Sequence, residues 1–318
     1  MSEDLSVRQW LGMKPAPVFL VVLAVVLAGQ SVNAQRLSYS SGQNVSPGFE
    51  GWETDEDGSR YFLFGYMNRN WEEEPNIPVG PDNNIEPGGP DLGQPTHFLP
   101  RRNRFVFRVP VPDGFEVDDE MVWTLTVNGV TDQAFATLRA DYFVDNMIRA
   151  SEHGAIGAGF TNEAIRANMG PTLGVESETH RSVRVGETVT LTAVAEDDGV
   201  PKSARVLRAT SSERSRADRW RPRFLATVNQ TTGLRVSWFV YRGEGGVTFD
   251  PPQVKVWEDP RTGAYSPWAA GFTLPDPPAD GKWVTKVSFD TPGTYVIRGL
   301  ASDGALDVVR DLTINVTE

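Results

Sequence analysis

The chain has 318 residues, about two domains' worth at ~100–200 residues per domain. It carries 30 Lys+Arg against 42 Asp+Glu, a net charge of −12, which argues against general binding to nucleic acid or to anionic membranes. There is no Cys and there are only 3 His, which excludes disulfides and thiolate zinc sites and disfavours histidine-rich metal sites. With 9 Trp, 7 Tyr and 16 Phe the chain can form hydrophobic cores.

The N-terminus has the pattern of a secretory signal peptide. Arg8 and Lys14 precede the apolar run Val18–Ala28, and Val32 and Ala34 occupy the −3 and −1 positions of a cleavage site. The run is shorter than the ~20 apolar residues that span a bilayer core. We therefore expect cleavage after Ala34 and an exported protein, periplasmic or extracellular, without a stable membrane anchor; an uncleaved anchor is the alternative.

The periodicity is that of β-strands almost throughout. Apolar residues alternate with polar ones over 123–127, and the following Asn128-Gly129 is the strongest short hairpin signal. Only Asn162–Met169 suggests a helix. The pattern predicts an all-β protein of two β-sandwich, immunoglobulin-like domains in tandem. The expected organisation is a signal peptide over 1–34, an N-terminal domain over 35–160, a linker over 161–170 and a C-terminal domain over 171–318.

The N-terminal domain contains a long polar stretch, Pro75–Pro100, with seven Pro and four Gly in 26 residues. Long connections of this kind are usually functional or disordered. Stiff polar loops can preorganise groups for a ligand, or their side chains can satisfy the loop's own backbone. The domain resembles an uncharacterised module of exported bacterial proteins with N-R-N, I-P-V-G-P-D-N and G-Q-P-T-x-F-L-P motifs, and no activity attaches to that resemblance. The candidate binding residues here are Asn68, Arg69, Asn70, Asp82, Asn83, Asp91, Gln94 and His97.

A second candidate in this domain is a calcium site. Asp55 and Asp57 stand at alternate positions before Gly58, a spacing that lets oxygens converge on a hard cation. The twelfth position of such a loop is Phe64 rather than a bidentate Glu, so the motif is partial. A tight hairpin turn at Asp57-Gly58 explains the same residues without metal. Ca²⁺ is the one cofactor considered, and none is otherwise expected.

The C-terminal domain contains VRVGETVTLTAVAEDDGVP, LRVSWFVYRGEGGVTF and VSFDTPGTYVIRGLASDGALDVVRDLTINV. These blocks resemble bacterial immunoglobulin-like domains of the PKD-like kind. The resemblance implies a spacer or binding module. It also implies that Trp238 is a buried core residue and that Tyr295 forms a tyrosine corner, with Leu191 and Ile297 as an apolar pair in place of the disulfide.

Two insertions interrupt this domain, over 199–233 and 258–281. The first is basic and offers Arg214, Arg216, Arg219 and Trp220 for an anionic partner, unless it is a solvated loop that pairs with acidic neighbours. The aromatic residues Trp257 and Trp268, at and inside the second insertion, are candidates for a glycan, unless they cover a sheet edge.

The sequence favours an exported, non-catalytic binding or structural module that engages a polysaccharide or a surface protein through its loops. One alternative is a carbohydrate-active hydrolase with a carboxylate pair in the N-terminal domain. Another is a calcium-stiffened extracellular spacer. The usual nucleophile, zinc-protease, phosphate-loop and dinucleotide motifs do not occur in the chain.

Overall fold

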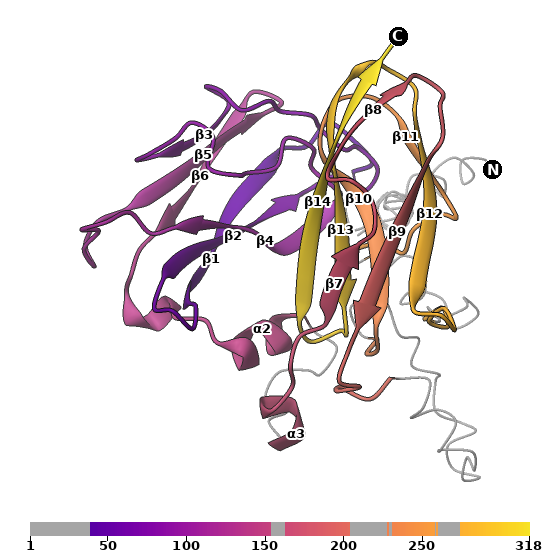
Figure 1. The fold of residues 1–318 in the computed structure, drawn as a ribbon. Coiled ribbons are helices and arrows are strands. Elements are labelled where there is room, and N and C mark those ends of the chain that lie inside the picture. Colours follow the sequence, from indigo (N-terminus) through magenta and orange to yellow (C-terminus); the bar gives the residue numbers. More distant parts are fainter. Residues whose placement is uncertain (1–38, 154–162, 204–227, 229–230, 258, 260–273) are drawn as a thin grey trace, which may run out of the picture. The chain divides into compact units, whose positions relative to one another are not determined.

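The computed structural model describes residues 39–153, 163–203, 228, 231–257, 259 and 274–318 (Figure 1). The span Tyr39–Glu318 forms one compact unit. The predicted signal peptide lies outside the described residues. Within these ranges no helix combines the length and the apolar character needed to cross a bilayer.

The first half of the unit is a pair of three-stranded sheets, here called the first sandwich. Its sheets have the strand orders β1-β2-β4 and β3-β5-β6, with all neighbours antiparallel. The strands are β1 (Val45–Thr54), β2 (Arg60–Asn68), β3 (Asn83–Glu86), β4 (Arg101–Pro110), β5 (Met121–Val127) and β6 (Val130–Ala136).

An aromatic cluster forms the core of the first sandwich. Trp123 is fully buried, and the rings of Phe64 and Phe107 lie 5.9 and 5.0 Å from it. The predicted alternation over β5 is confirmed, because every second residue from Met121 to Val127 is buried. The predicted hairpin is also observed: Asn128 and Gly129 adopt φ of 52° and 77°, the left-handed pair of a type I′ turn.

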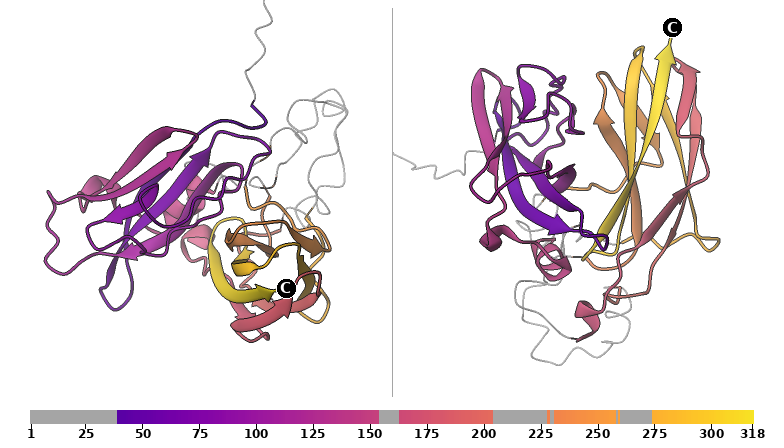
Figure 2. Two further views of the ribbon diagram at one scale, coloured as in Figure 1. Left: turned by 90° about the horizontal axis from the view of Figure 1, so that it is seen from above. Right: turned by 60° about the vertical axis from the view of Figure 1, so that its left-hand side comes forward.

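The second half consists of two four-stranded sheets, the second sandwich, whose two layers are visible in Figures 1 and 2. One sheet has the order β7-β9-β12-β11 and the other β8-β14-β13-β10. The strands are β7 (Thr172–Val175), β8 (His180–Arg184), β9 (Val189–Glu196), β10 (Arg235–Arg242), β11 (Val247–Asp250), β12 (Lys282–Phe289), β13 (Gly293–Ser302) and β14 (Asp307–Thr317). Among the strand pairs of this sandwich in the described ranges, β8–β14 is parallel and the rest are antiparallel.

If β8 is set aside as an added edge strand, the seven remaining strands have the order of an immunoglobulin-like fold. The first, second, fifth and fourth (β7, β9, β12 and β11) form one sheet, and the third, sixth and seventh (β10, β13 and β14) form the other. Trp238 lies on β10, the third strand of this scheme, and shares one core with Leu191 and Ile297. The Tyr295 hydroxyl bonds back to Thr291, 3.0 Å from its carbonyl oxygen, as a tyrosine corner requires. The all-β prediction is confirmed, and the second sandwich has an immunoglobulin-like strand order. The tandem arrangement of two immunoglobulin-like domains, the PKD-like assignment and the domain boundaries stay predictions.

Short helices connect the two sandwiches: η1 (Ala140–Tyr142), α2 (Asn146–Glu152) and α3 (Glu163–Arg166). The helix expected over Asn162–Met169 is therefore observed over four residues. Helix α2 was not predicted. Its N-cap is Asp145, whose carboxylate accepts a hydrogen bond from the Ile148 amide at 2.8 Å.

Candidate functional site

The two sandwiches are joined by hydrogen bonds between β10 and the long Pro/Gly-rich loop of the first sandwich. Arg242 forms a two-pronged ion pair with Asp91, at 2.7 and 3.0 Å, which holds the pKa of that carboxyl below its usual value. The Tyr241 hydroxyl donates to the Gly93 carbonyl oxygen, and burial raises the pKa of this tyrosine to about 12. The loop thus contacts the second sandwich through an ion pair and through a hydrogen bond to its backbone.

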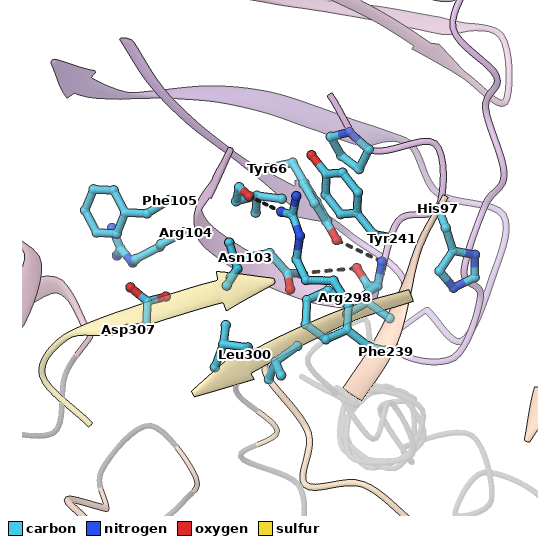
Figure 3. Close-up of a pocket in the computed structure, with 15 residues that line it drawn as sticks. Tyr66, His97, Asn103, Arg104, Phe105, Phe239, Tyr241, Arg298, Leu300 and Asp307 are labelled. Carbon is cyan, nitrogen blue, oxygen red and sulfur yellow. Dashed lines mark hydrogen bonds between the residues drawn. The ribbon is translucent and has the colours of Figure 1, made fainter. Parts of the chain in front are cut away.

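Arg298 on β13 strengthens the same junction. Its guanidinium stacks on the Tyr241 ring at 3.3 Å, pairs with Asp311 at 2.7 Å and donates to the Val106 carbonyl oxygen of β4 at 2.6 Å. Figure 3 shows this side chain beside a cavity of about 50 Å³ that is also lined by Tyr66. A cavity of this size holds no more than a water or two.

A larger cavity of about 400 Å³ adjoins the small one and shares His97, Leu99, Phe239 and Val256 with it. We call it the junction cleft. Glu74, His97 and Leu99 of the first sandwich contribute to its lining. The second sandwich supplies residues 238–240 of β10, residues 245–247, Phe249 and the segment 253–257. Ligand pockets typically measure ~300–1,000 Å³, so the cleft has the size of a binding site.

His97 is fixed in the cleft wall by contacts on both ring nitrogens. Nδ1 lies 2.8 Å from Asn76 Oδ1, and Nε2 lies 2.9 Å from Glu74 Oε2. Its backbone amide donates to the Tyr241 carbonyl oxygen at 3.2 Å. The ring is therefore held in place before any ligand arrives.

The opposite wall is formed by an irregular segment after β11. Trp257 is only 6% exposed, and the Lys255 ammonium lies 4.5 Å from the centre of its ring. The same ammonium pairs with Asp259 at 2.7 Å. Gln253 belongs to this segment and bonds it to β10, because its Oε1 accepts a hydrogen bond from the Trp238 amide at 3.0 Å.

The exposed wall of the cleft is polar and apolar in nearly equal parts: Val247, Phe249 and Val254 lie beside Glu74, His97, Gln253 and Lys255. Glu74 is the sole carboxylate among the described residues that line it. The carboxylate pair required by the hydrolase alternative is not assembled in that part of the structure.

Of the candidates predicted from sequence, His97 and Trp257 line the cleft, and Asp91 belongs to the ion pair beside it. His97 and Trp257 lie about 160 residues apart in the sequence, and the fold places them in opposite walls of the cleft.

Four other candidates are completely buried and bond to the loop backbone. The Asn83 amide donates to the carbonyl oxygens of Ile77 and Pro95 and accepts from the Trp123 indole. The other three use their amides in the same way. These side chains satisfy the backbone of the loop, which is the structural alternative given above, and their geometry does not support the binding role predicted for them. The four residues are Asn68, Asn70, Asn83 and Gln94.

Asp82 and Arg69 are exposed and lie outside the cleft lining. Asp55 and Asp57 lie in the turn between β1 and β2. The first pairs with Arg108 at 2.9 Å, and the second accepts from the Ser59 amide at 2.9 Å, which lowers the pKa of its carboxyl.

No group of three or more His, Cys, Asp or Glu side chains in the described ranges is arranged to hold a metal ion. The calcium site stays a prediction. Five candidates lie outside the described residues: Arg214, Arg216, Arg219, Trp220 and Trp268.

Sequence reasoning missed Gln253 and Lys255. They alternate with Val254 and Val256, which is a strand-like pattern. The structure forms a strand only over β11, because Pro251 and Pro252 follow it and cannot donate to a sheet ladder. The alternating polar and apolar residues that follow Pro251 and Pro252 were therefore the sequence pattern that could have indicated this wall of the cleft.

No protein-family model and no curated protein matches the chain. A conjugative transposon lipoprotein from Bacteroides eggerthii DSM 20697 is similar in structure at 11% identity, covering 46% of this chain and 96% of that one, with a TM-score of 0.25. Domains 4 and 5 of the S-layer protein SbsC cover 76% and 79% at 11% identity, TM-score 0.22. The D00-D0 domain of intimin covers 85% and 99% at 10% identity, TM-score 0.22. Likeness this weak carries no argument, so the fold assignment rests on strand order and contacts.

Proposed function

We propose that the protein is an exported, non-catalytic binding module whose ligand lies in the junction cleft. The observation that carries the proposal is the cleft itself, about 400 Å³ between two walls that come from different sandwiches. The N-terminal signal-peptide pattern supports export. The ligand classes are the two considered from sequence, a polysaccharide or a segment of a surface protein.

The walls are preorganised, which favours binding because little order is lost on association. His97 is held by Asn76 and Glu74, and the loop that carries it is held by the Arg242–Asp91 pair. Among the described residues, a partner would meet Glu74 as the acidic group and Lys255 as the basic group at the cleft.

Thermal unfolding of the purified protein with acidic polysaccharides, neutral polysaccharides and synthetic peptides tests the proposal. A ligand of the cleft should raise Tm by several degrees at saturation. The variant Lys255→Glu should abolish the shift, and Lys286→Glu, an exposed lysine on β12, should retain it. Equal shifts in both variants would place the ligand elsewhere, and no shift with any probe would contradict the proposed function.

A further inference from the structure

The edge of strand β10 carries an inference about the ligand. β10 is the terminal strand of its sheet and pairs with β13 on one side only. In an edge strand, alternate residues turn their backbone N–H and C=O away from the sheet, where another chain can pair with them. Trp238 is such a residue, because its amide points to Gln253 rather than to β13.

Gln253 occupies the place that a neighbouring strand's carbonyl would take. Its Oε1 accepts from the Trp238 amide at 3.0 Å, while its Nε2 donates to the Pro251 carbonyl oxygen at 2.6 Å and to Thr285 Oγ1 at 3.3 Å. A side-chain amide is a small, replaceable partner. Exchanging it for a backbone carbonyl leaves the number of hydrogen bonds at Trp238 unchanged.

The same edge already pairs with extended backbone farther along. The Tyr241 carbonyl oxygen accepts from the amides of Thr96 and His97, both at 3.2 Å. His97 also lines the cleft, so the established pairing is continuous with the cleft along β10. The three β10 residues that line the cleft, 238–240, span roughly 10 Å at ~3.3 Å per residue, the length of a short strand segment.

The side chains around this edge suit a peptide better than a sugar. Val247, Phe249 and Val254 line the cleft and offer an apolar pocket for one side chain. A sugar ring needs an open aromatic face, but Trp257 is 94% buried and Lys255 lies over its ring. The available donor with a defined direction is the strand amide of Trp238.

We infer that the junction cleft takes an extended peptide segment of a partner protein, which adds to the edge of β10. The segment gives a carbonyl oxygen to the Trp238 amide in place of Gln253, and it places an apolar side chain beside Phe249. Backbone pairing provides the affinity, and the pocket selects the side chain. This inference rests on the proposed function and names the chemistry of the partner.

Selection from a phage-displayed library of random seven-residue peptides tests the inference. Synthetic copies of the selected peptides should lose binding when alternate backbone amides of one set are N-methylated, and should keep it when the other set is methylated, because strand pairing uses every second residue. The variant Gln253→Ala should bind them about three- to tenfold more tightly, since the competing hydrogen bond is removed. The matched control Gln133→Ala, on the edge strand β6 of the first sandwich, should leave the affinity unchanged.

Amide hydrogen exchange gives a second readout. In Gln253→Ala the Trp238 amide should exchange faster than in the parent protein, and a bound peptide should slow it again. Failure to select any peptide, or binding that is insensitive to both methylation sets, would overturn the inference. If a polysaccharide then binds and Lys255→Glu abolishes its binding, the proposed function stands without the peptide. If neither class binds, both fail.

Discussion

The two sandwiches solve the same packing problem with different chemistry. In the first, the buried Trp123 donates its indole N–H to Asn83, 3.0 Å away on the long loop, so core and loop form one hydrogen-bonded structure. In the second, the indole N–H of Trp238 has no hydrogen-bond partner among the described residues, and its ring instead packs so closely on Gly299 that an added Cβ would lie 2.9 Å from it. A hydrogen bond to the loop thus holds the central tryptophan of the first core, and close packing holds that of the second.

The largest effects are expected from the two tryptophans. Trp123→Ala and Trp238→Ala should each destabilise by ~3–5 kcal/mol, since both side chains are buried. The informative comparison is Trp→Phe. Trp123→Phe leaves the buried Asn83 oxygen without its donor and should cost ~1–3 kcal/mol more than Trp238→Phe.

Denaturant unfolding of the two Trp→Phe variants measures the difference, with the parent protein as reference. Gly299→Ala is the converse experiment on the second core, where overpacking should cost ~1–3 kcal/mol. Equal losses for the two Trp→Phe changes would show that the Asn83 hydrogen bond contributes nothing and would remove the distinction between the cores.

A second comparison concerns two buried tyrosines. The Tyr295 hydroxyl contacts Thr291 and the Glu244 carbonyl oxygen, whereas the Tyr66 hydroxyl accepts from the Leu99 amide at 2.9 Å. Tyr295→Phe should cost ~1–3 kcal/mol and Tyr66→Phe ~1 kcal/mol, because the first change leaves more groups unpaired. Chemical denaturation checks the order, and a reversed order would contradict it.

The connection between the sandwiches should make stability depend on pH. His153, the residue after α2, is largely buried, and burial lowers the pKa of its imidazole below the ordinary 6.5. The unfolded chain therefore gains a proton first as the pH falls, so this residue should reduce stability progressively below about pH 6.5. His153→Phe should flatten the decline between pH 7 and 5, as measured by Tm at each pH.

Asp197 in the second sandwich should act in the opposite direction. Burial raises the pKa of its carboxyl to about 6, so its charged form is unfavourable in the folded protein at pH 7. Protonation of the folded state as the pH falls toward 4 should offset part of the loss caused by His153. Asp197→Asn should raise Tm at pH 7 and have little effect at pH 4; a lower Tm at pH 7 would contradict this.

The smallest effects are expected at two turn glycines in open surroundings. Gly129, between β5 and β6, has φ of 77°, and Gly281, before β12, has φ of 69°; no atom lies within 4 Å of an added Cβ at either. Gly→Ala should cost ~1 kcal/mol at both because of backbone strain alone. Unequal losses would indicate that one turn relaxes and the other does not.

The sequence predicts those parts of the fold that depend on neighbours in the chain. The alternation over β5 and the Asn128-Gly129 turn were predictable, since strand faces and turn geometry follow from local residues. The apolar pair Leu191 and Ile297 was predicted only through the resemblance to immunoglobulin-like domains, and both residues do belong to one core. Helix α2 was missed because only Ala150 among its seven residues is buried, so it has no apolar stripe.

The candidate site was less predictable, because its walls come from distant segments. His97 and Trp257 were chosen for their chemistry, but only the fold shows that they line one cavity. Asn83 was chosen for the same reason, yet its partners lie 6, 12 and 40 residues away, and this separation conceals a structural role. Residue type suggested a binding role for His97 and for Asn83 alike, and only their contacts in the fold show that His97 lines the cleft while Asn83 holds the loop.

The parallel pairing of β8 with β14 has a mechanical consequence. Five residue pairs, from His180 with Thr313 to Arg184 with Thr317, join these strands. A force that pulls the start of β8 and the end of β14 apart acts along the strands, so the hydrogen bonds between them are sheared together rather than opened one by one. Along this direction the second sandwich should resist extension more than along one that peels a hairpin such as β13–β14, and single-molecule pulling from paired attachment sites would compare the two.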